Sequence, residues 1–136
     1  MRLAVVASLF NREVVDRMVE RALARAKELD LQVTSVVRVP GTFEIPPAVQ
    51  QLLRRSDVDG AVALGAVIKG ETKHDEVIMA AAAQALMDVG LQTGKPVGLG
   101  ITGPGMTDEQ AMARIEAAAR AVDAAKTMHD LLRGLR

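Results

Sequence analysis

The sequence predicts an α/β fold in which helices cover both faces of a parallel β-sheet. Apolar segments without regular polar alternation, such as Gly60–Ile68, are typical of parallel strands that are covered on both faces. These segments alternate along the chain with segments in which apolar residues recur at helical spacing, and the connections between them are short. Such alternation implies right-handed crossovers and a parallel sheet. A chain of 136 residues is expected to form a single domain, residues 1–136.

The first half of the pattern begins with a short apolar strand, expected at Leu3–Ser8. A helix is expected at Glu13–Leu29, because apolar residues recur there near helical spacing. Asn11 is a candidate N-cap for this helix, since its side chain can accept a hydrogen bond from a free backbone N–H. The next strand is expected at Gln32–Val39, which is rich in β-branched residues.

Proline and glycine punctuate the rest of the chain. Pro40 and Gly41 end the second strand, and a short helix is expected at about Ile45–Arg55, with a proline pair in its first turn, where proline is tolerated. The remaining elements are expected as a strand at Gly60–Ile68, a helix at Lys73–Leu91, a strand at Pro96–Thr102, a loop at Thr102–Gly105, and a last helix that opens with the capping box Thr107–Gln110 and runs to about Arg133.

Composition excludes several classes of function. The formal net charge is zero and the sequence has no Lys/Arg tract, which argues against nucleic acid as a partner. There is no cysteine, hence no disulfide and no thiol nucleophile, as fits a cytoplasmic protein. No apolar run is long enough to span a membrane. The apolar N-terminus reads better as a first strand than as a signal peptide.

The chain has no Trp and no Tyr, and its two phenylalanines, Phe10 and Phe43, each follow a predicted strand. Ligands bind at the carboxyl ends of strands in open parallel sheets, so this placement suggests a stacking role; local packing of the loops is the alternative. The third strand ends in a polar corner, Glu71 to His74, that opens a helix. Free N–H groups and the dipole at such a helix start favour an anion. Together with His74, this corner suggests chemistry on a small phosphorylated compound.

Two helices carry more apolar surface than a monomer needs. Residues 77–83 are all apolar. The last helix has a second apolar stripe beside its first, formed by Ala117, Ala121, Ala124, Met128 and Leu131. A surface helix normally carries one stripe, so the second is expected to face another subunit. The high helix propensity of alanine is the alternative explanation.

The chain resembles the lumazine synthase family in two motifs that occur in the family's order, PGTFEIP at 40–46 and GAVIKGETKH at 65–74. Phe10-Asn11 after the first strand and the EQA sequence at 109–111, shortly before Arg114, agree with the family pattern. The likeness covers nearly the whole chain. The loop at 101–107 and the short N-terminus look most like the archaeal form of the family.

The resemblance implies a three-layer, flavodoxin-like doubly wound fold with four parallel strands in the order 2-1-3-4. It implies a transferase of riboflavin biosynthesis that condenses 5-amino-6-(D-ribitylamino)uracil with 3,4-dihydroxy-2-butanone 4-phosphate to 6,7-dimethyl-8-ribityllumazine, releasing phosphate and water. The chemistry implied is a Schiff-base condensation that uses no cofactor and no metal. The family forms homopentamers with active sites between neighbouring subunits, and many members assemble into a 60-subunit icosahedral capsid.

The resemblance also implies roles for individual residues. His74 would transfer protons during the condensation, which suits an imidazole. The pyrimidine and ribityl contacts would come from Phe10, Thr42, Phe43, Glu44, Ala66, Val67, Ile68 and Leu99. The phosphate contacts would come from Gly70, Glu71, Thr72 and Arg114, with Arg114 belonging to the neighbouring subunit.

Most of these roles have a plainer structural alternative. Glu44 and Thr72 could serve only to start helices, and His74 and Arg114 could be solvated helix residues. Leu99 departs from bacterial relatives, which often carry an aromatic residue there, so ring stacking would be lost at this position.

Other assignments stay open at the level of the sequence. A catalytically inactive shell-forming or flavin-binding protein of the same fold would keep assembly and lose turnover. An archaeal riboflavin synthase would lack the two motifs, and a generic phosphate-binding regulator would not explain Phe10 and Phe43. Arg120 could supply a second basic group to the phosphate. His129, on the apolar stripe of the last helix, is expected to be structural.

Overall fold

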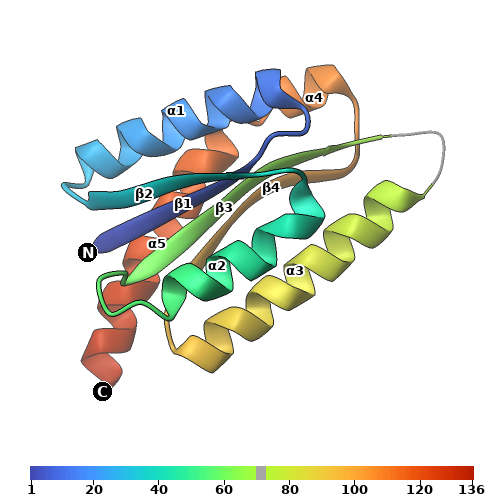
Figure 1. The fold of residues 1–136 in the computed structure, drawn as a ribbon. Helices are drawn as coiled ribbons and strands as arrows, with labels where there is room; N and C mark the ends of the chain where they lie inside the picture. Colours follow the sequence, from blue (N-terminus) through green and yellow to red (C-terminus); the bar gives the residue numbers. More distant parts are fainter. Residues whose placement is uncertain (70–72) are drawn as a thin grey trace.

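The computed structural model describes residues 1–69 and 73–136, and this described part forms a four-stranded parallel sheet in the order β2-β1-β3-β4 (Figure 1). The α/β fold and the strand order predicted from the sequence are both confirmed. The strands are β1 (Arg2–Ser8), β2 (Gln32–Val39), β3 (Gly60–Ile68) and β4 (Val97–Met106).

Helices cover both faces of the sheet, with α1 and α5 on one face and α2 and α3 on the other (Figure 1). No helix in the described part of the chain is long and apolar enough to cross a membrane. The helices are α1 (Arg12–Glu28), α2 (Ile45–Leu53), α3 (His74–Thr93), α4 (Asp108–Ala113) and α5 (Glu116–Leu135), and a short 3-10 turn, η1 (Thr42–Glu44), precedes α2.

The strand order reverses between β1 and β3, which are neighbours in the sheet although β2 lies between them in sequence. The chain leaves β1 toward α1 on one face and leaves β3 toward α3 on the other face (Figure 1). In doubly wound sheets this divergence opens a crevice at the carboxyl ends of the strands, where ligands bind. The topology therefore marks the exits of β1 and β3 as the place to look for a site.

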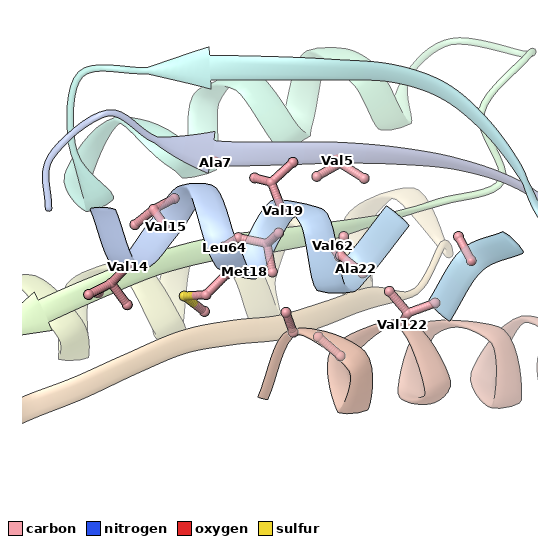
Figure 2. Close-up of a cluster of buried hydrophobic side chains, with 14 of the residues drawn as sticks. Val5, Ala7, Val14, Val15, Met18, Val19, Ala22, Val62, Leu64 and Val122 are labelled. Carbon is pink, nitrogen blue, oxygen red and sulfur yellow. The ribbon is translucent and has the colours of Figure 1, made fainter. Parts of the chain in front are cut away.

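The core consists of aliphatic side chains on each side of the sheet. Between the sheet and the helices α1 and α5, the cluster includes Val5, Met18, Leu64 and Val122 (Figure 2). The cluster between the sheet and the helices α2 and α3 includes Val6, Ile45, Ala63 and Leu86. Complete burial of one such Val, Leu, Ile or Met side chain contributes about 1.5–3 kcal/mol. Both phenylalanines lie outside these clusters, so the aromatic residues of this chain do not build its core.

The sequence-based prediction of one continuous last helix is wrong, because the helix breaks into α4 and α5 at Arg114 and Ile115. At the break the N–H groups of residues 114, 117 and 118 bond carbonyls three residues back, which tightens the backbone into a turn. The turn lets α4 pack on the ends of β3 and β4 while α5 packs along β4 and α1. No Gly or Pro marks the break in the sequence, so tertiary packing decides it.

The predicted loop at Thr102–Gly105 is also wrong in part, because β4 continues to Met106. Thr102 pairs with Ala66 and Met106 pairs with Ile68, so residues 103–105 of β4 bulge opposite a single residue of β3. The bounds of β2 and β3 are those predicted, and the remaining boundaries lie within two residues of the predicted ones. The bulge keeps the end of β4 in the sheet and brings residues 103–105 beside the exit of β3.

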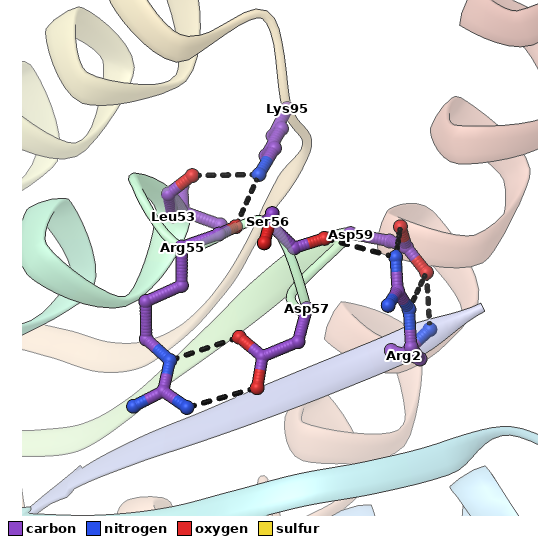
Figure 3. Close-up of polar contacts among 7 residues, drawn as sticks. All are labelled: Arg2, Leu53, Arg55, Ser56, Asp57, Asp59 and Lys95. Atoms are coloured by element: carbon purple, nitrogen blue, oxygen red, sulfur yellow. Dashed lines mark hydrogen bonds and ion pairs between the residues drawn. The ribbon is translucent and has the colours of Figure 1, made fainter.

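Polar contacts fix the opposite end of the sheet, near the amino ends of the strands (Figure 3). The backbone N–H of Arg2 donates to Asp59 Oδ2 at 2.7 Å, and its guanidinium donates to Oδ2 and Oδ1 of the same carboxylate at 3.2 and 3.1 Å. Lys95 Nζ donates to the carbonyls of Leu53 and Arg55, both at 2.8 Å, which satisfies carbonyl groups at the end of α2.

Candidate active site

A cavity of about 440 Å³ lies at the carboxyl edge of the sheet, where β1, β2 and β3 end. The cavity gathers most of the residues that the sequence predicts for the pyrimidine and ribityl subsite, and it includes the predicted proton-transfer residue. Its lining consists of Phe10, Asn11, Gly41, Thr42, Phe43, Glu44, Ala66, Val67, Ile68, His74, Asp75 and Ile78.

The two phenylalanines lie at this cavity with their side chains largely exposed, Phe10 at 69% and Phe43 at 64%. The backbone N–H of Phe10 donates to the carbonyl of Pro40 at 3.2 Å, which continues the pairing of β1 with β2 beyond the strand ends. Phe43 is held in the η1 turn directly after β2. Exposed aromatic faces on a fixed backbone can stack on a flat ligand.

Thr42 and Glu44 come from the same turn but differ in burial. Thr42 is buried, and a Cβ placed on Gly65 of β3 would lie only 2.9 Å from Thr42 Oγ1. The glycine therefore makes room for the threonine at the floor of the cavity. Glu44 is exposed, and its N–H donates to the carbonyl of Gly41 at 3.1 Å. Its carboxylate is available to hydroxyl groups of a ligand.

Asn11 does not act as the N-cap that the sequence predicts. It directly precedes α1, but its backbone is left-handed (φ 57°, ψ 46°) and its side chain makes no capping hydrogen bond. Its Nδ2 instead donates to the carbonyl of Ala66 at 2.6 Å. Asparagine tolerates left-handed backbone better than most residues, and this conformation points the side chain across to β3. The carbonyl of Ala66, one of the residues predicted to contact the pyrimidine, therefore already accepts a hydrogen bond from the protein.

α3 brings His74 and Asp75 to the cavity in its first turn. His74 is exposed, whereas Asp75 is buried. Asp75 Oδ2 accepts a hydrogen bond from the backbone N–H of Gly105, in the β4 bulge, at 2.7 Å. The sequence did not single out Asp75 or Ile78 as lining residues; the acidic run after His74 was the available signal for Asp75, and none marked Ile78.

Three predicted phosphate contacts, Gly70, Glu71 and Thr72, lie outside the described residues. On either side of them, Lys69 and Lys73 are both exposed. No three His, Asp or Glu side chains within residues 1–69 and 73–136 come together in a group that could hold a metal ion.

Arg114 and Leu99 do not line the 440 Å³ cavity of their own chain. Arg114 is exposed at the end of α4. Leu99, on β4, lines a second cavity of about 380 Å³ between α3, β4 and α5. The other residues that line this second cavity are mainly apolar, among them Met87, Leu91 and Met128.

The other histidine and the second candidate basic residue also lie apart from the site. His129 is half-buried on α5, and burial lowers the pKa of its imidazole. Arg120 is exposed on the same helix. Neither residue lines the 440 Å³ cavity.

Comparison with known proteins gives a consistent result. Residues 1–136 match the family described as 6,7-dimethyl-8-ribityllumazine synthase. The chain is 54% identical to the 6,7-dimethyl-8-ribityllumazine synthase of Staphylothermus marinus over 128 residues, which cover 93% of this chain and 85% of that protein. It is 52% identical to the synthase of Metallosphaera sedula over 135 residues, covering 98% and 89%. It is 48% identical to the synthase of Methanopyrus kandleri over 134 residues, which cover 98% of this chain and 95% of that protein.

Proposed function

We propose that this chain, which belongs to the 6,7-dimethyl-8-ribityllumazine synthase family, carries out the family's reaction in the 440 Å³ cavity at the carboxyl edge of its sheet. The enzyme condenses 5-amino-6-(D-ribitylamino)uracil with 3,4-dihydroxy-2-butanone 4-phosphate and releases phosphate, water and 6,7-dimethyl-8-ribityllumazine, the precursor of riboflavin. The alternative of an inactive shell-forming or flavin-binding protein is not favoured, since the compared relatives are named as synthases.

The observation that carries the site proposal is the convergence of Phe10, the η1 turn and His74, from three different strand exits, on one cavity. Phe10 and Phe43 would hold the pyrimidine ring by stacking, which is worth about 1–3 kcal/mol per base in proteins that bind nucleic acids. Thr42 and Glu44 would bind the ribityl hydroxyls. Hydrogen bonds to a charged group such as the Glu44 carboxylate contribute about 1.5–3 kcal/mol each.

His74 would move the protons that the condensation requires. The ring amine adds to the ketone carbonyl, and the adduct loses water to give the Schiff base. Loss of phosphate, ring closure and loss of a second water follow. These steps transfer protons among nitrogen, oxygen and carbon atoms of the substrates, including the C–H proton that must leave before phosphate is eliminated, and an imidazole can accept and donate protons near neutral pH. This role is supported by the position of His74, which is the first residue of α3 and lines the cavity.

The second substrate would be held by its phosphate group, through Gly70, Glu71 and Thr72 of one subunit and Arg114 of its neighbour. Arg114 and Leu99 are exposed but lie away from the cavity of their own chain, which supports a site completed between subunits. A guanidinium can bind phosphate through two parallel hydrogen bonds. Leu99 of the neighbour would add an apolar wall to the pyrimidine subsite.

We further propose a homopentamer, of the kind that can assemble into a 60-subunit icosahedral capsid. Its support on the chain is the exposed apolar surface of α3 and α5, which includes Val77, Met87, Leu91 and Met128. A cytoplasmic location belongs to the same proposal, because a phosphorylated substrate does not cross a bilayer unaided. A single domain spanning residues 1–136 is also proposed, and the family match over that range supports it.

The test combines turnover with a change at the stacking residue. The purified chain is mixed with both substrates, and lumazine formation is followed by absorbance and fluorescence, against which a protein without Trp or Tyr contributes little background. We expect formation well above the uncatalysed rate. Phe10→Ala should raise KM for the pyrimidine about tenfold, the equivalent of a lost stacking interaction, with KM for the butanone phosphate nearly unchanged. Tight pyrimidine binding without product would instead support a binding protein, and equal effects on both KM values would contradict the placement of Phe10.

A further inference from the structure

The end of β4 holds the chain on both sides of the segment 70–72. Before the segment, the backbone N–H of Lys69 donates to the carbonyl of Met106 at 2.7 Å. After it, Asp75 Oδ2 accepts the backbone N–H of Gly105, also at 2.7 Å. Two consecutive residues of β4 therefore fix the end of β3 and the start of α3.

The partner that Asp75 binds is itself firmly placed. Gly103 and Gly105 have left-handed backbone angles, with φ of 122° and 77°, which glycine adopts at little cost. A Cβ on Gly103 would lie 2.6 Å from the Val67 carbonyl oxygen, so the bulge packs directly against the cavity wall formed by Val67. A hydrogen bond to this bulge ties α3 to the wall of the site.

Asp75 is the buried member of the first turn of α3. Lys73, His74 and Glu76 are exposed, whereas Asp75 is only 9% exposed. A carboxylate at the start of a helix is favoured by the helix dipole, and hydrogen bonds to an ionised acceptor are about twice as strong as neutral ones. The side chain of Lys73, which precedes the helix, makes no capping hydrogen bond. The Asp75 contact thus links the position of this turn to a fixed part of the sheet.

We propose that Asp75 is a positioning residue for the condensation: its hydrogen bond to Gly105 sets the first turn of α3 and thereby the adjacent His74 against the cavity. The inference rests on the proposed function, in which His74 transfers protons. It assigns Asp75 no proton transfer of its own. The distance between the reacting groups depends on this contact, and a misplacement of about 1 Å can slow a reaction by up to about 100-fold.

Three substitutions separate a hydrogen-bond role from a role of the charge. Asp75→Asn keeps an oxygen that can accept the Gly105 N–H but removes the charge. Asp75→Glu keeps the charge but displaces the carboxylate by about 1.5 Å, the length of one extra carbon–carbon bond. Asp75→Ala removes both. Glu76→Gln is the matched control, since Glu76 is exposed in the same turn and does not line the cavity.

Initial rates with each substrate varied, together with urea unfolding, give the readouts. We expect Asp75→Ala and Asp75→Glu to lower kcat by about tenfold, with KM for the pyrimidine changed less than twofold, because Phe10 and Phe43 lie on other segments. Asp75→Asn and Glu76→Gln should stay within about threefold of the wild-type kcat. If Asp75 only stabilised the fold, its variants would lower the urea midpoint without lowering kcat while KM for the pyrimidine stays nearly constant.

Two results would overturn the inference while leaving the proposed function intact. One is an active Asp75→Glu combined with a slow Asp75→Asn, which would show that the charge is what matters. The other is a kcat of Asp75→Glu equal to that of Glu76→Gln. Both comparisons remain possible if Asp75→Ala fails to fold, because they use only the kcat values of Asp75→Glu, Asp75→Asn and Glu76→Gln. A wild-type chain that forms no product would overturn the proposed function and this inference together.

Discussion

The side chain of Asn11 bonds the carbonyl oxygen of Ala66 at 2.6 Å, joining the exit of β1 to the end of β3. These two strands flank the point at which the strand order reverses, where their connections leave toward opposite faces of the sheet. Both residues line the 440 Å³ cavity, so the hydrogen bond lies in the wall of the candidate site. Asn11 also has a left-handed backbone. One residue therefore supplies both the left-handed turn before α1 and the hydrogen bond to β3.

Replacement of Asn11 separates these two contributions. Asn11→Gly loses the hydrogen bond but accommodates the left-handed backbone, and we expect it to reduce the free energy of unfolding by about 1–2 kcal/mol. Asn11→Ala loses the bond and also strains the backbone, at a further cost of about 1 kcal/mol. Urea denaturation of both variants measures the difference. An alanine variant as stable as the glycine variant would contradict the backbone conformation assigned to this position.

Gly65 provides space for Thr42 at the floor of the cavity. In Gly65→Ala the new methyl group would lie 2.9 Å from Thr42 Oγ1 and 3.4 Å from Ser8 Oγ, so Thr42 must shift. We expect KM for the pyrimidine to rise about tenfold, the loss of one hydrogen bond to the ligand. Gly134→Ala is the control, because a Cβ there would meet no atom within 4 Å. Unchanged pyrimidine kinetics in Gly65→Ala would remove Thr42 from the binding site.

The Arg2–Asp59 contact predicts a specific pH dependence of stability. Hydrogen bonds from Arg2 lower the pKa of the Asp59 carboxyl from 3.8 to about 2. Because the pKa is lower in the folded state, the stabilisation is complete above the unfolded value and is lost as the pH falls from 3.8 to about 2. Asp59→Asn should therefore be less stable than wild type at pH 7, and the two stabilities should converge across this acidic window.

The matched control for this titration is Asp57→Asn. Asp57 pairs with Arg55, only two residues away, and both side chains are exposed. Surface pairs of this kind contribute little, although the pKa of Asp57 is lowered to about 2 as well. We expect urea midpoints of Asp57→Asn close to wild type at pH 7. A loss of stability in Asp57→Asn as large as that in Asp59→Asn would show that the Arg2–Asp59 pair stabilises the fold no more than the surface pair of Asp57 does.

The exposed apolar surface of α3 predicts where subunits meet. Leu91 is 75% exposed and lines the 380 Å³ cavity, whereas Leu135 is 74% exposed and does not line it. Complete burial of a leucine contributes about 1.5–3 kcal/mol, and a buried charge costs more than that. Leu91→Lys should therefore reduce the assembly to smaller species in light scattering, and Leu135→Lys should leave its mass unchanged. Equal masses for Leu91→Lys and wild type would place the interface elsewhere.

The sequence predicted the fold well because its signals are local. An uninterrupted apolar run predicts β3 and helical spacing predicts α1, and both elements lie within one residue of the expected bounds. The gathering of Phe10, Phe43 and His74 at one edge followed from topology alone. Such predictions succeed because the carboxyl ends of parallel strands must share an edge.

The features that the sequence missed are set by contacts between distant residues. No Gly or Pro marks the break between α4 and α5 in the sequence. The break depends on the packing of α4 against the sheet edge and of α5 against α1. The sequence predicts a helix cap at Asn11, whereas its side chain bonds Ala66, which is 55 residues away. The bond between Asp75 and Gly105 spans 30 residues. No local pattern encodes such pairs.

The most direct test of the central claim is the kcat of His74→Ala with both substrates saturating. His129→Gln serves as the control, since His129 is the chain's other histidine and lies away from the cavity. If the cavity at the carboxyl edge is where the condensation occurs, His74→Ala should turn over about 100-fold more slowly or worse, with its assembly unchanged and His129→Gln near wild type. A His74→Ala variant that forms lumazine at the wild-type rate would contradict the assignment of this site.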